Sequence, residues 1–311
     1  MMGAAQMPRH NDMLLTQAQA LALLRNWLGT DVVCQGFEPL EGGICSAVYR
    51  LHFECPPFSA VVKLQSDRED DPLPRERKRL EYLHLKTKIP CPRIYLQDDS
   101  RKTIPYSFLL LECLPGTNLE STRIAESQRA TIEQELAEAL LDLHSHKAET
   151  FGDIGQAGAR RWTDIFLPDL EENRRDIVGL LPDDILEKMD QALPLAETAL
   201  RDQGDPTLIH NDVWAGNIMV HEREDGWHLS GLLDPVGLRY AEVEMELAYL
   251  EAFRTVGQQF FQVYTAQRPL RSGYEYRKLF YWLNTFMIHI WLGFGSEFHD
   301  RIATTCDRIT T

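Results

Sequence analysis

The most informative segment of the chain is His210-Asn211-Asp212-Val213-Trp214-Ala215-Gly216-Asn217. It is followed by the apolar run Ile218-Met219-Val220, a polar turn around Asp225-Gly226, a second apolar run from Leu229 to Leu233, and Asp234-Pro235. Two apolar runs separated by such a turn indicate a β-hairpin. Because a hairpin folds back on itself, Asn217 before its first strand and Asp234 after its second are predicted to lie side by side.

The spacing of the polar residues in this stretch indicates phosphate transfer. A His-x-Asp-x-x-x-x-Asn segment, a hairpin and then an Asp form the pattern by which protein-kinase-like folds transfer phosphate. Asp212 is the expected acceptor of the proton from the attacking hydroxyl, and Asn217 and Asp234 are the expected ligands of Mg²⁺ bound to ATP. A second His-Asn-Asp, at residues 10–12, lacks the later Asn, the hairpin and the second Asp. The tripeptide alone therefore carries no weight.

Length and charge limit the classes of partner. The chain has 311 residues, enough for two lobes or one large domain. Its net charge of −15 repels nucleic-acid backbones and anionic membranes, so neither is expected as a partner. A cationic substrate would be attracted, although an acidic surface that aids solubility is the simpler explanation. The sequence leaves a monomer and a homodimer equally open.

Neither a targeting segment nor a membrane-spanning segment is expected from the sequence. Its first ten residues lack the charged and apolar parts of a signal peptide. The apolar run 279–294 is interrupted by Asn284, Thr285 and His289 and is shorter than a spanning helix needs, so a buried helix is predicted. The six cysteines lack paired zinc spacing. Reduced thiols in a cytoplasmic protein are expected.

Apolar periodicity divides the chain into two predicted lobes and a tail. Residues 1–12 are expected to be a flexible tail, 13–114 a β-rich lobe that covers the nucleotide, and 115–311 a mainly helical lobe with the catalytic and substrate residues. The fold class is α+β, two-lobed and protein-kinase-like. Strands are predicted at 32–37, 47–53, 59–64, 93–96 and 106–111, and helices at 16–28, 75–85 and 132–144.

The predicted small lobe contains a candidate phosphate loop. Gly42 and Gly43 lie between two predicted strands, followed by Cys45 and Ser46. Glycines allow backbone amides to approach anionic oxygens closely, so these four residues are expected at the nucleotide. In such an exposed loop the Cys45 thiol would be reactive, and its oxidation would impair ATP binding. The alternative is an unreactive cysteine buried beneath the turn.

The remaining nucleotide contacts are expected from the third strand, the following helix and the linker. Lys63 lies where kinase folds place the lysine that pairs with the phosphates. A helix acid should orient it, with Glu76 as first choice and Glu81 as second. Glu112 and Leu114 lead out of a buried strand and are expected to bind adenine through their main chains. A linker that contacts no ligand is the other interpretation.

Several further motifs resemble one family. The chain resembles the fructosamine kinases (ketosamine-3-kinases), within the aminoglycoside-phosphotransferase and choline-kinase branch of the kinase fold. The resemblance covers nearly the whole chain after about residue 30 and rests on these motifs: Gly42-Gly43 with Val48-Tyr49-Arg50-Leu51, Leu140 to His144, Phe151-Gly152-Asp153-Ile154-Gly155, Trp162 with Phe166, Asp-x-Trp-x-Gly-Asn from Asp212 to Asn217, Asp234-Pro235, Pro269-Leu270, Gly273-Tyr274-Glu275, and His289 with Phe294-Gly295.

The resemblance implies an ATP- and Mg²⁺-dependent kinase whose acceptor is a sugar hydroxyl of a ketosamine adduct, on a small glycated amine or a protein lysine. Trp214 could stack against that sugar, or simply pack the loop. His210 is expected to brace the loop by a hydrogen bond. The chain departs from the family at Asn211, where Gly is usual, and in residues 236–248, where many members carry Arg-Glu-x-Asp-Leu-Ala.

Two alternatives remain open from the sequence. One is a choline- or aminoglycoside-type phosphotransferase acting on a cationic amino alcohol or amino sugar. The acids Glu242, Glu244 and Glu246 could attract such a cation, or could simply favour the start of a helix through its dipole. The other is a non-catalytic nucleotide-binding protein. The presence of all the required acids counts against it.

Overall fold

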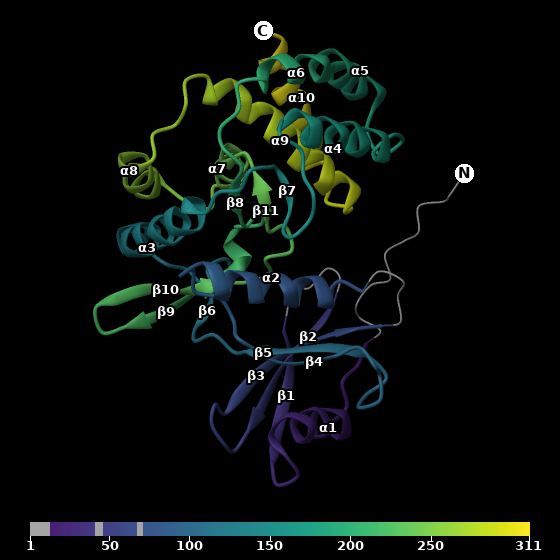
Figure 1. Ribbon diagram of the computed structural model, residues 1–311, viewed down its shortest axis with the longest axis vertical. Helices are drawn as coiled ribbons and strands as arrows, with labels where there is room; N and C mark the ends of the chain where they lie inside the picture. The colour runs from purple at the N-terminus through teal and green to yellow at the C-terminus, as the bar shows by residue number, and fades with distance from the viewer. Residues whose placement is uncertain (1–12, 41–45, 67–70) are drawn as a thin grey trace.

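The computed structural model describes residues 13–40, 46–66 and 71–311, so the expected tail and the Gly42-Gly43 turn lie outside the described residues. It has two lobes, one built around a sheet and the other mainly helical (Figure 1). The small lobe comprises α1 (Gln17–Leu28), β1 (Cys34–Leu40), β2 (Ala47–Phe53), β3 (Ser59–Gln65), α2 (Leu73–Lys86), β4 (Ile94–Asp98) and β5 (Ser107–Glu112). The predicted two-lobed α+β fold is confirmed.

The small-lobe sheet is antiparallel with strand order β1-β2-β3-β5-β4. Successive residues of a strand face opposite sides, so β5 supplies both faces. Leu110 packs in the cluster of α1, whereas Leu109 and Leu111 pack in the cluster that includes Leu80 and Leu83 of α2. Coverage by a helix on each face explains why the apolar run of β5 is buried without alternation.

The first helix begins where the sequence supplies a capping box. The N–H of Gln19 donates to the Thr16 hydroxyl at 3.3 Å, and the Gln19 side chain accepts from the Thr16 N–H at 2.9 Å. Two amides that a helix end leaves unpaired are thereby satisfied. Strand β1 runs to Leu40, past the predicted end at 37, and includes Pro39. A proline is tolerated there because β1 is an edge strand.

The large lobe contains more short strands than the sequence predicted. Its elements are β6 (Thr117–Asn118), α3 (Glu126–Ser145), β7 (Gly152–Asp153), α4 (Thr163–Asp176), α5 (Asp183–Ala192), η2 (Leu193–Leu195), α6 (Ala196–Ala199), β8 (Thr207–Ile209), η3 (Ala215–Asn217), β9 (Ile218–Arg223), β10 (Gly226–Leu232), β11 (Arg239–Ala241), α7 (Val243–Ala252), α8 (Gln258–Gln267), α9 (Tyr274–Trp291) and α10 (Glu297–Thr310). The predicted hairpin consists of β9 and β10, and β6 pairs with the outer edge of β9 to complete a three-stranded sheet. The unpredicted strands β7, β11 and β8 form a second small sheet.

Helix α9 is the centre of the large-lobe core. Twelve of its residues are buried, and Phe280, Leu283 and Met287 among them lie in the same apolar cluster as Trp162 and Phe166 of the α4 region. The predicted buried helix at this place is confirmed. Among the described residues, no helix combines the length and apolar character needed to cross a membrane.

Candidate active site

Asp212 lies in the loop between β8 and η3, and both of its carboxylate oxygens are held. The Asn217 side-chain amide donates to Oδ2 at 2.8 Å and to the Asp212 carbonyl at 3.0 Å. Tyr249 of α7 donates its hydroxyl to Oδ1 at 2.7 Å. The carboxylate is therefore fixed in direction before any substrate arrives, as a proton acceptor requires.

The pKa of Asp212 is raised to about 6, chiefly by burial. The charge of Glu246 also raises this pKa, and the hydrogen bonds from Tyr249 and Asn217 lower it. A carboxylate with a raised pKa is a better proton acceptor than an exposed one and remains largely ionised at neutral pH. The position suits acid–base chemistry.

A buried carboxylate from α7 holds the backbone of this loop. Glu246 is fully buried and accepts from the N–H of His210 at 3.1 Å and of Asn211 at 2.6 Å. Its third donor is the Nε2 of His144, at 2.8 Å. Burial alone would raise the pKa of Glu246, but the hydrogen bond from His144 and the other donors outweigh it and keep the pKa below its usual value.

His210 braces the loop by a hydrogen bond as expected, but through its main chain and not through its ring. Neither ring nitrogen of His210 makes a hydrogen bond of normal geometry with a described residue, and burial lowers the pKa of the ring. The loop is braced through the backbone N–H of His210 by Glu246 instead. The sequence pattern identified the braced position but not the bracing group.

The departure at Asn211 has a conformational reason. Asn211 has φ of 65°, in the left-handed region that glycine and asparagine tolerate best. Its side chain lies against Gly237, where an added Cβ would come within 2.8 Å of the Asn211 Cβ. Asn211 therefore meets the same backbone demand as the glycine usual in the family, and Gly237 leaves space for the larger residue.

The hairpin brings Asn217 and Asp234 together as predicted, because the N–H of Leu233 donates to the Asn217 carbonyl at 2.9 Å. The side-chain nitrogen of Asn217 donates to Asp212, and the side-chain oxygen makes no hydrogen bond to a described residue. Asp234 has φ of 54° and a side chain that is 32% exposed. An amide oxygen and a carboxylate suit Mg²⁺, which takes one or two protein oxygens and completes its shell with phosphates and water.

Lys63 of β3 joins the two lobes at this point. Its ammonium contacts Glu76 Oε1 of α2 at 2.6 Å and also the Asp234 carboxylate. The Lys63 side chain is only 13% exposed and that of Glu76 only 5%. Glu81, the second choice as partner, pairs with Arg77 instead, at 2.8 Å.

The other residues expected to contact the nucleotide differ in whether their polar groups are free to do so. Ser46 is buried directly before β2, with its hydroxyl 3.5 Å from the Gln65 side chain. The N–H of Glu112 donates to the Arg93 carbonyl at 2.8 Å and is engaged, whereas the N–H of Leu114 makes no hydrogen bond to a described residue. Gly42, Gly43 and Cys45 lie outside the described residues.

Trp214 is half-buried and folds back over Gly216, where a Cβ would come within 2.3 Å of its indole ring. A glycine is thus required one residue before Asn217. The indole ring packs on Gly216 of its own loop, and the backbone N–H of Trp214 donates to the Asp212 carbonyl at 3.2 Å.

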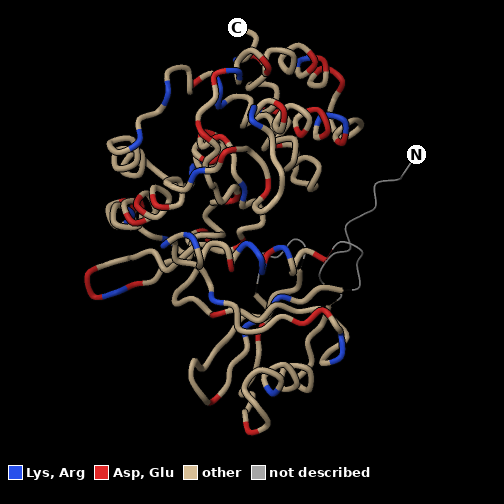
Figure 2. Tube along the Cα trace, viewed as in Figure 1, with Lys and Arg blue, Asp and Glu red and all other residues tan. Residues whose placement is uncertain are grey.

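The acids Glu242, Glu244 and Glu246 are all buried and do not form a surface for a cation. Glu244 forms a bidentate pair with Arg277 at 2.6 and 2.7 Å, and Glu242 accepts from Arg271 at 2.8 Å. Figure 2 shows the acidic segment of α7 inside the large lobe. Because these carboxylates are buried and already paired, they give no argument for a cationic acceptor.

Two site residues were missed from the sequence, Tyr249 and, as a bracing group, Glu246. Both lie on α7, three residues apart, so they share one face of that helix. The signal available was this spacing within the segment that follows Asp234. It does not reveal the partners, which lie 36 and 37 residues away in the chain.

The small-lobe sheet with α2, the catalytic loop and the hairpin define a protein-kinase-like fold. The phosphotransferase enzyme family matches residues 36–280, and the chain belongs to that family. The predicted branch of the kinase fold is confirmed.

Two curated relatives match parts of the chain. A Staphylococcus aureus protein named "Probable ketoamine kinase" is 35% identical over 107 residues, 34% of this chain and 35% of that protein. A Synechocystis protein of the same name is 29% identical over 149 residues, 45% of this chain and 47% of that one. The matched segments thus span about a third and about half of these relatives.

Solved structures match over nearly the whole chain. A "Putative fructosamine-3-kinase" from Haemophilus somnus has a TM-score of 0.72 at 17% identity, covering 94% of this chain and 96% of that one. The ADP-bound aminoglycoside phosphotransferase APH(2'')-Ib has a TM-score of 0.63 at 16% identity, covering 95% and 99%. At these identities the likeness establishes the fold.

Proposed function

We propose that the protein is an ATP-dependent small-molecule kinase that phosphorylates a sugar hydroxyl of a ketoamine. The observation that carries this is one cluster formed by Asp212, Asn217, Asp234 and the Lys63–Glu76 pair. Four separate parts of the chain supply it. Most of the catalysis in phosphoryl transfer comes from such positioning and from stabilisation of charge.

Each residue has a role that follows from its contacts. Asp212, held by Tyr249 and Asn217, would orient the acceptor hydroxyl and take its proton. Lys63, oriented by Glu76, would bind the phosphates. Asn217 and Asp234 would hold Mg²⁺, which supplies neutralising charge to the phosphate oxygens when bound.

The division of labour between the lobes is part of the proposal. Residues 13–114 would cover the nucleotide, with Gly42, Gly43, Cys45 and Ser46 near the phosphates, and residues 115–311 would carry the catalytic and acceptor groups. The N–H of Leu114 has no partner among the described residues, which supports a main-chain contact to adenine there. The N–H of Glu112 is engaged, so only its carbonyl remains a candidate. The cytoplasmic location and the oligomeric state stay predictions.

The acceptor is proposed from relatives and from the site. Both curated relatives are named ketoamine kinases, and a fructosamine-3-kinase is among the similar folds. Trp214, half-buried beside the cluster, would offer a face to a sugar ring. Aminoglycoside phosphotransferases share the fold, so an amino-sugar acceptor is the second candidate.

A substrate panel tests the proposal. ADP release would be measured with MgATP and, in parallel, a fructosyl-amine, a glycated lysine peptide, an amino alcohol and an aminoglycoside. We expect acceptor-dependent turnover with the ketoamines. Turnover with the aminoglycoside alone would move the acceptor assignment to the second candidate, and turnover with none of them would contradict it.

Asp234→Asn and Lys63→Met are expected to weaken binding of MgATP by at least about tenfold, since loss of even an outer-shell partner of a metal costs that much. The first removes the charge that attracts Mg²⁺, and the second removes the phosphate contact. Calorimetric titration with MgATP measures both. The exposed pair Lys188–Asp307, also 2.6 Å apart, supplies the controls Lys188→Met and Asp307→Asn. Parental affinity in both site variants would contradict the nucleotide assignment.

A further inference from the structure

Helix α2 contacts both lobes. Glu76 pairs with Lys63 inside the small lobe. Three residues further, Arg79 Nη2 lies 3.1 Å from Asp153 Oδ1 of the large lobe, and three residues beyond that the hydroxyls of Tyr82 and Tyr240 share a hydrogen bond of 2.8 Å. Residues three apart are neighbours on a helix surface, so one side of α2 carries all three contacts. Figure 1 shows α2 between the small-lobe sheet and the large lobe.

The large-lobe ends of these contacts belong to the sheet that supports the site. Asp153 ends β7 and Tyr240 is in β11, which pairs with β7 on one side and with β8 on the other. Strand β8 runs directly into the loop of Asp212, and β11 follows the turn after Asp234. The position of α2 is therefore tied to the same strands that carry the proposed catalytic and metal-binding acids.

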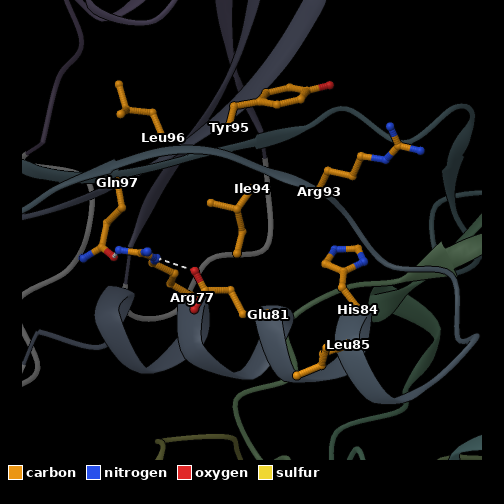
Figure 3. Close-up of a pocket in the computed structure, with 9 residues that line it drawn as sticks. All are labelled: Arg77, Glu81, His84, Leu85, Arg93, Ile94, Tyr95, Leu96 and Gln97. Atoms are coloured by element: carbon orange, nitrogen blue, oxygen red, sulfur yellow. Dashed lines mark hydrogen bonds and ion pairs between the residues drawn. The ribbon is translucent and has the colours of Figure 1, made fainter.

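The opposite side of α2 faces the small-lobe strand β4. A groove of about 690 Å³ separates Arg77, Glu81 and His84 of the helix from the strand residues 93–97 (Figure 3). Leu80 and Leu83 hold α2 on the sheet, but apolar contacts have little directional preference. Across the groove Arg77 donates to the Gln97 side chain at 3.3 Å, and His84 Nε2 lies 3.0 Å from the Pro92 carbonyl. These two bonds orient α2 on the small-lobe sheet, whereas the bonds of Arg79 and Tyr82 orient it relative to the large lobe.

We propose that Asp153 and Tyr240 form a clamp on α2 that keeps Glu76 on Lys63, so that the phosphate-binding lysine is in place before nucleotide arrives. Asp153 and Tyr240 are positioning residues, since they act through Arg79 and Tyr82. The inference rests on the proposed kinase function and gives a role to the Phe151-Gly152-Asp153 motif, which that function left unexplained.

The clamp is tested by direct titration with MgATP in the absence of any acceptor. Asp153→Ala should weaken nucleotide binding by about tenfold, within the range of interaction energies for contacting residues. Arg79→Gln should have the same effect. The double variant Asp153→Ala, Arg79→Gln should bind MgATP no more weakly than either single variant, because both changes remove the same contact. In a Glu76→Gln background, Asp153→Ala should add almost nothing, because the residue acts through Glu76.

The control is Asp190→Ala. Asp190 pairs with Arg174 at 2.9 Å across α4 and α5, and Arg174 is buried to nearly the same extent as Arg79, with side chains 15% and 13% exposed. This variant should bind MgATP like the parent. Tyr82→Phe, which removes one hydroxyl, provides a mild second variant if Asp153→Ala fails to fold, and it should also weaken binding.

The outcomes separate the clamp from the proposed function. Parental affinity in both Asp153→Ala and Tyr82→Phe, with Glu76→Gln weakened, would overturn the clamp and leave the kinase proposal standing. An equal loss on Asp153→Ala in the parent and in the Glu76→Gln background would also overturn it. Parental affinity in Glu76→Gln would overturn the clamp together with the phosphate role of the Lys63–Glu76 pair.

Discussion

Asp212→Ala is expected to lower kcat for the accepted ketoamine by about 10²–10⁴-fold, the contribution of a positioned general base. Binding of MgATP should remain near the parental value, because Asp212 is proposed to act on the acceptor hydroxyl. Its side-chain hydrogen bonds are with Asn217 and Tyr249, and Lys63 bonds instead to Glu76 and Asp234. Steady-state kinetics and nucleotide titration on the same preparation give both quantities.

A second variant separates loss of the proton acceptor from loss of side-chain packing. Asp212→Asn keeps the size of the side chain and one acceptor for the surrounding donors, yet it cannot take a proton. It should lose turnover as Asp212→Ala does. Asp307→Asn, on the surface of the large lobe, should be unaffected. Near-parental turnover in both Asp212 variants would show that another group accepts the proton.

Glu246→Ala is expected to destabilise the protein by about 3 kcal/mol or more. It leaves two buried donors unpaired, the His210 N–H and the His144 ring, together with the part-buried N–H of Asn211, and each unsatisfied buried donor costs about 1–3 kcal/mol. Urea denaturation measures the loss. Turnover should fall even where the variant is folded, because the loop of Asp212 loses its brace.

Glu246→Gln should be milder, since the amide retains one oxygen acceptor. The exposed Glu171 on α4 gives the control Glu171→Gln, which should leave the unfolding midpoint unchanged. A Glu246→Ala protein as stable as this control would mean that the loop does not depend on the α7 carboxylate.

Local pattern predicted the hairpin and the metal-binding pair well. Two apolar runs around Asp225-Gly226 specify a hairpin by themselves, and the hairpin fixes Asn217 near Asp234. The choice of Glu76 for Lys63 likewise followed from a strand and the next helix along the chain. In both cases the interacting residues lie in elements that follow one another in the chain, so the sequence was enough to predict the contact.

Tertiary partners distant in the chain could not be predicted. The alternating acids 242, 244 and 246 look like a solvated helix start, and only the folded chain brings Arg277 and His144 to them. The two-residue strands β6 and β7 have no pattern of their own and exist because a neighbouring strand offers hydrogen bonds. Asn211 shows the same limit, since its left-handed backbone is visible only in the folded loop.

The most direct test of the account is the product itself. A fructosyl-amine would be incubated with MgATP and the protein, and the acceptor would then be examined by mass spectrometry and phosphorus NMR. We predict that the acceptor gains one phosphoryl group on a sugar hydroxyl with the parent protein and none with Asp212→Asn. An unmodified ketoamine with the parent protein, under conditions where MgATP binds, would contradict the central claim.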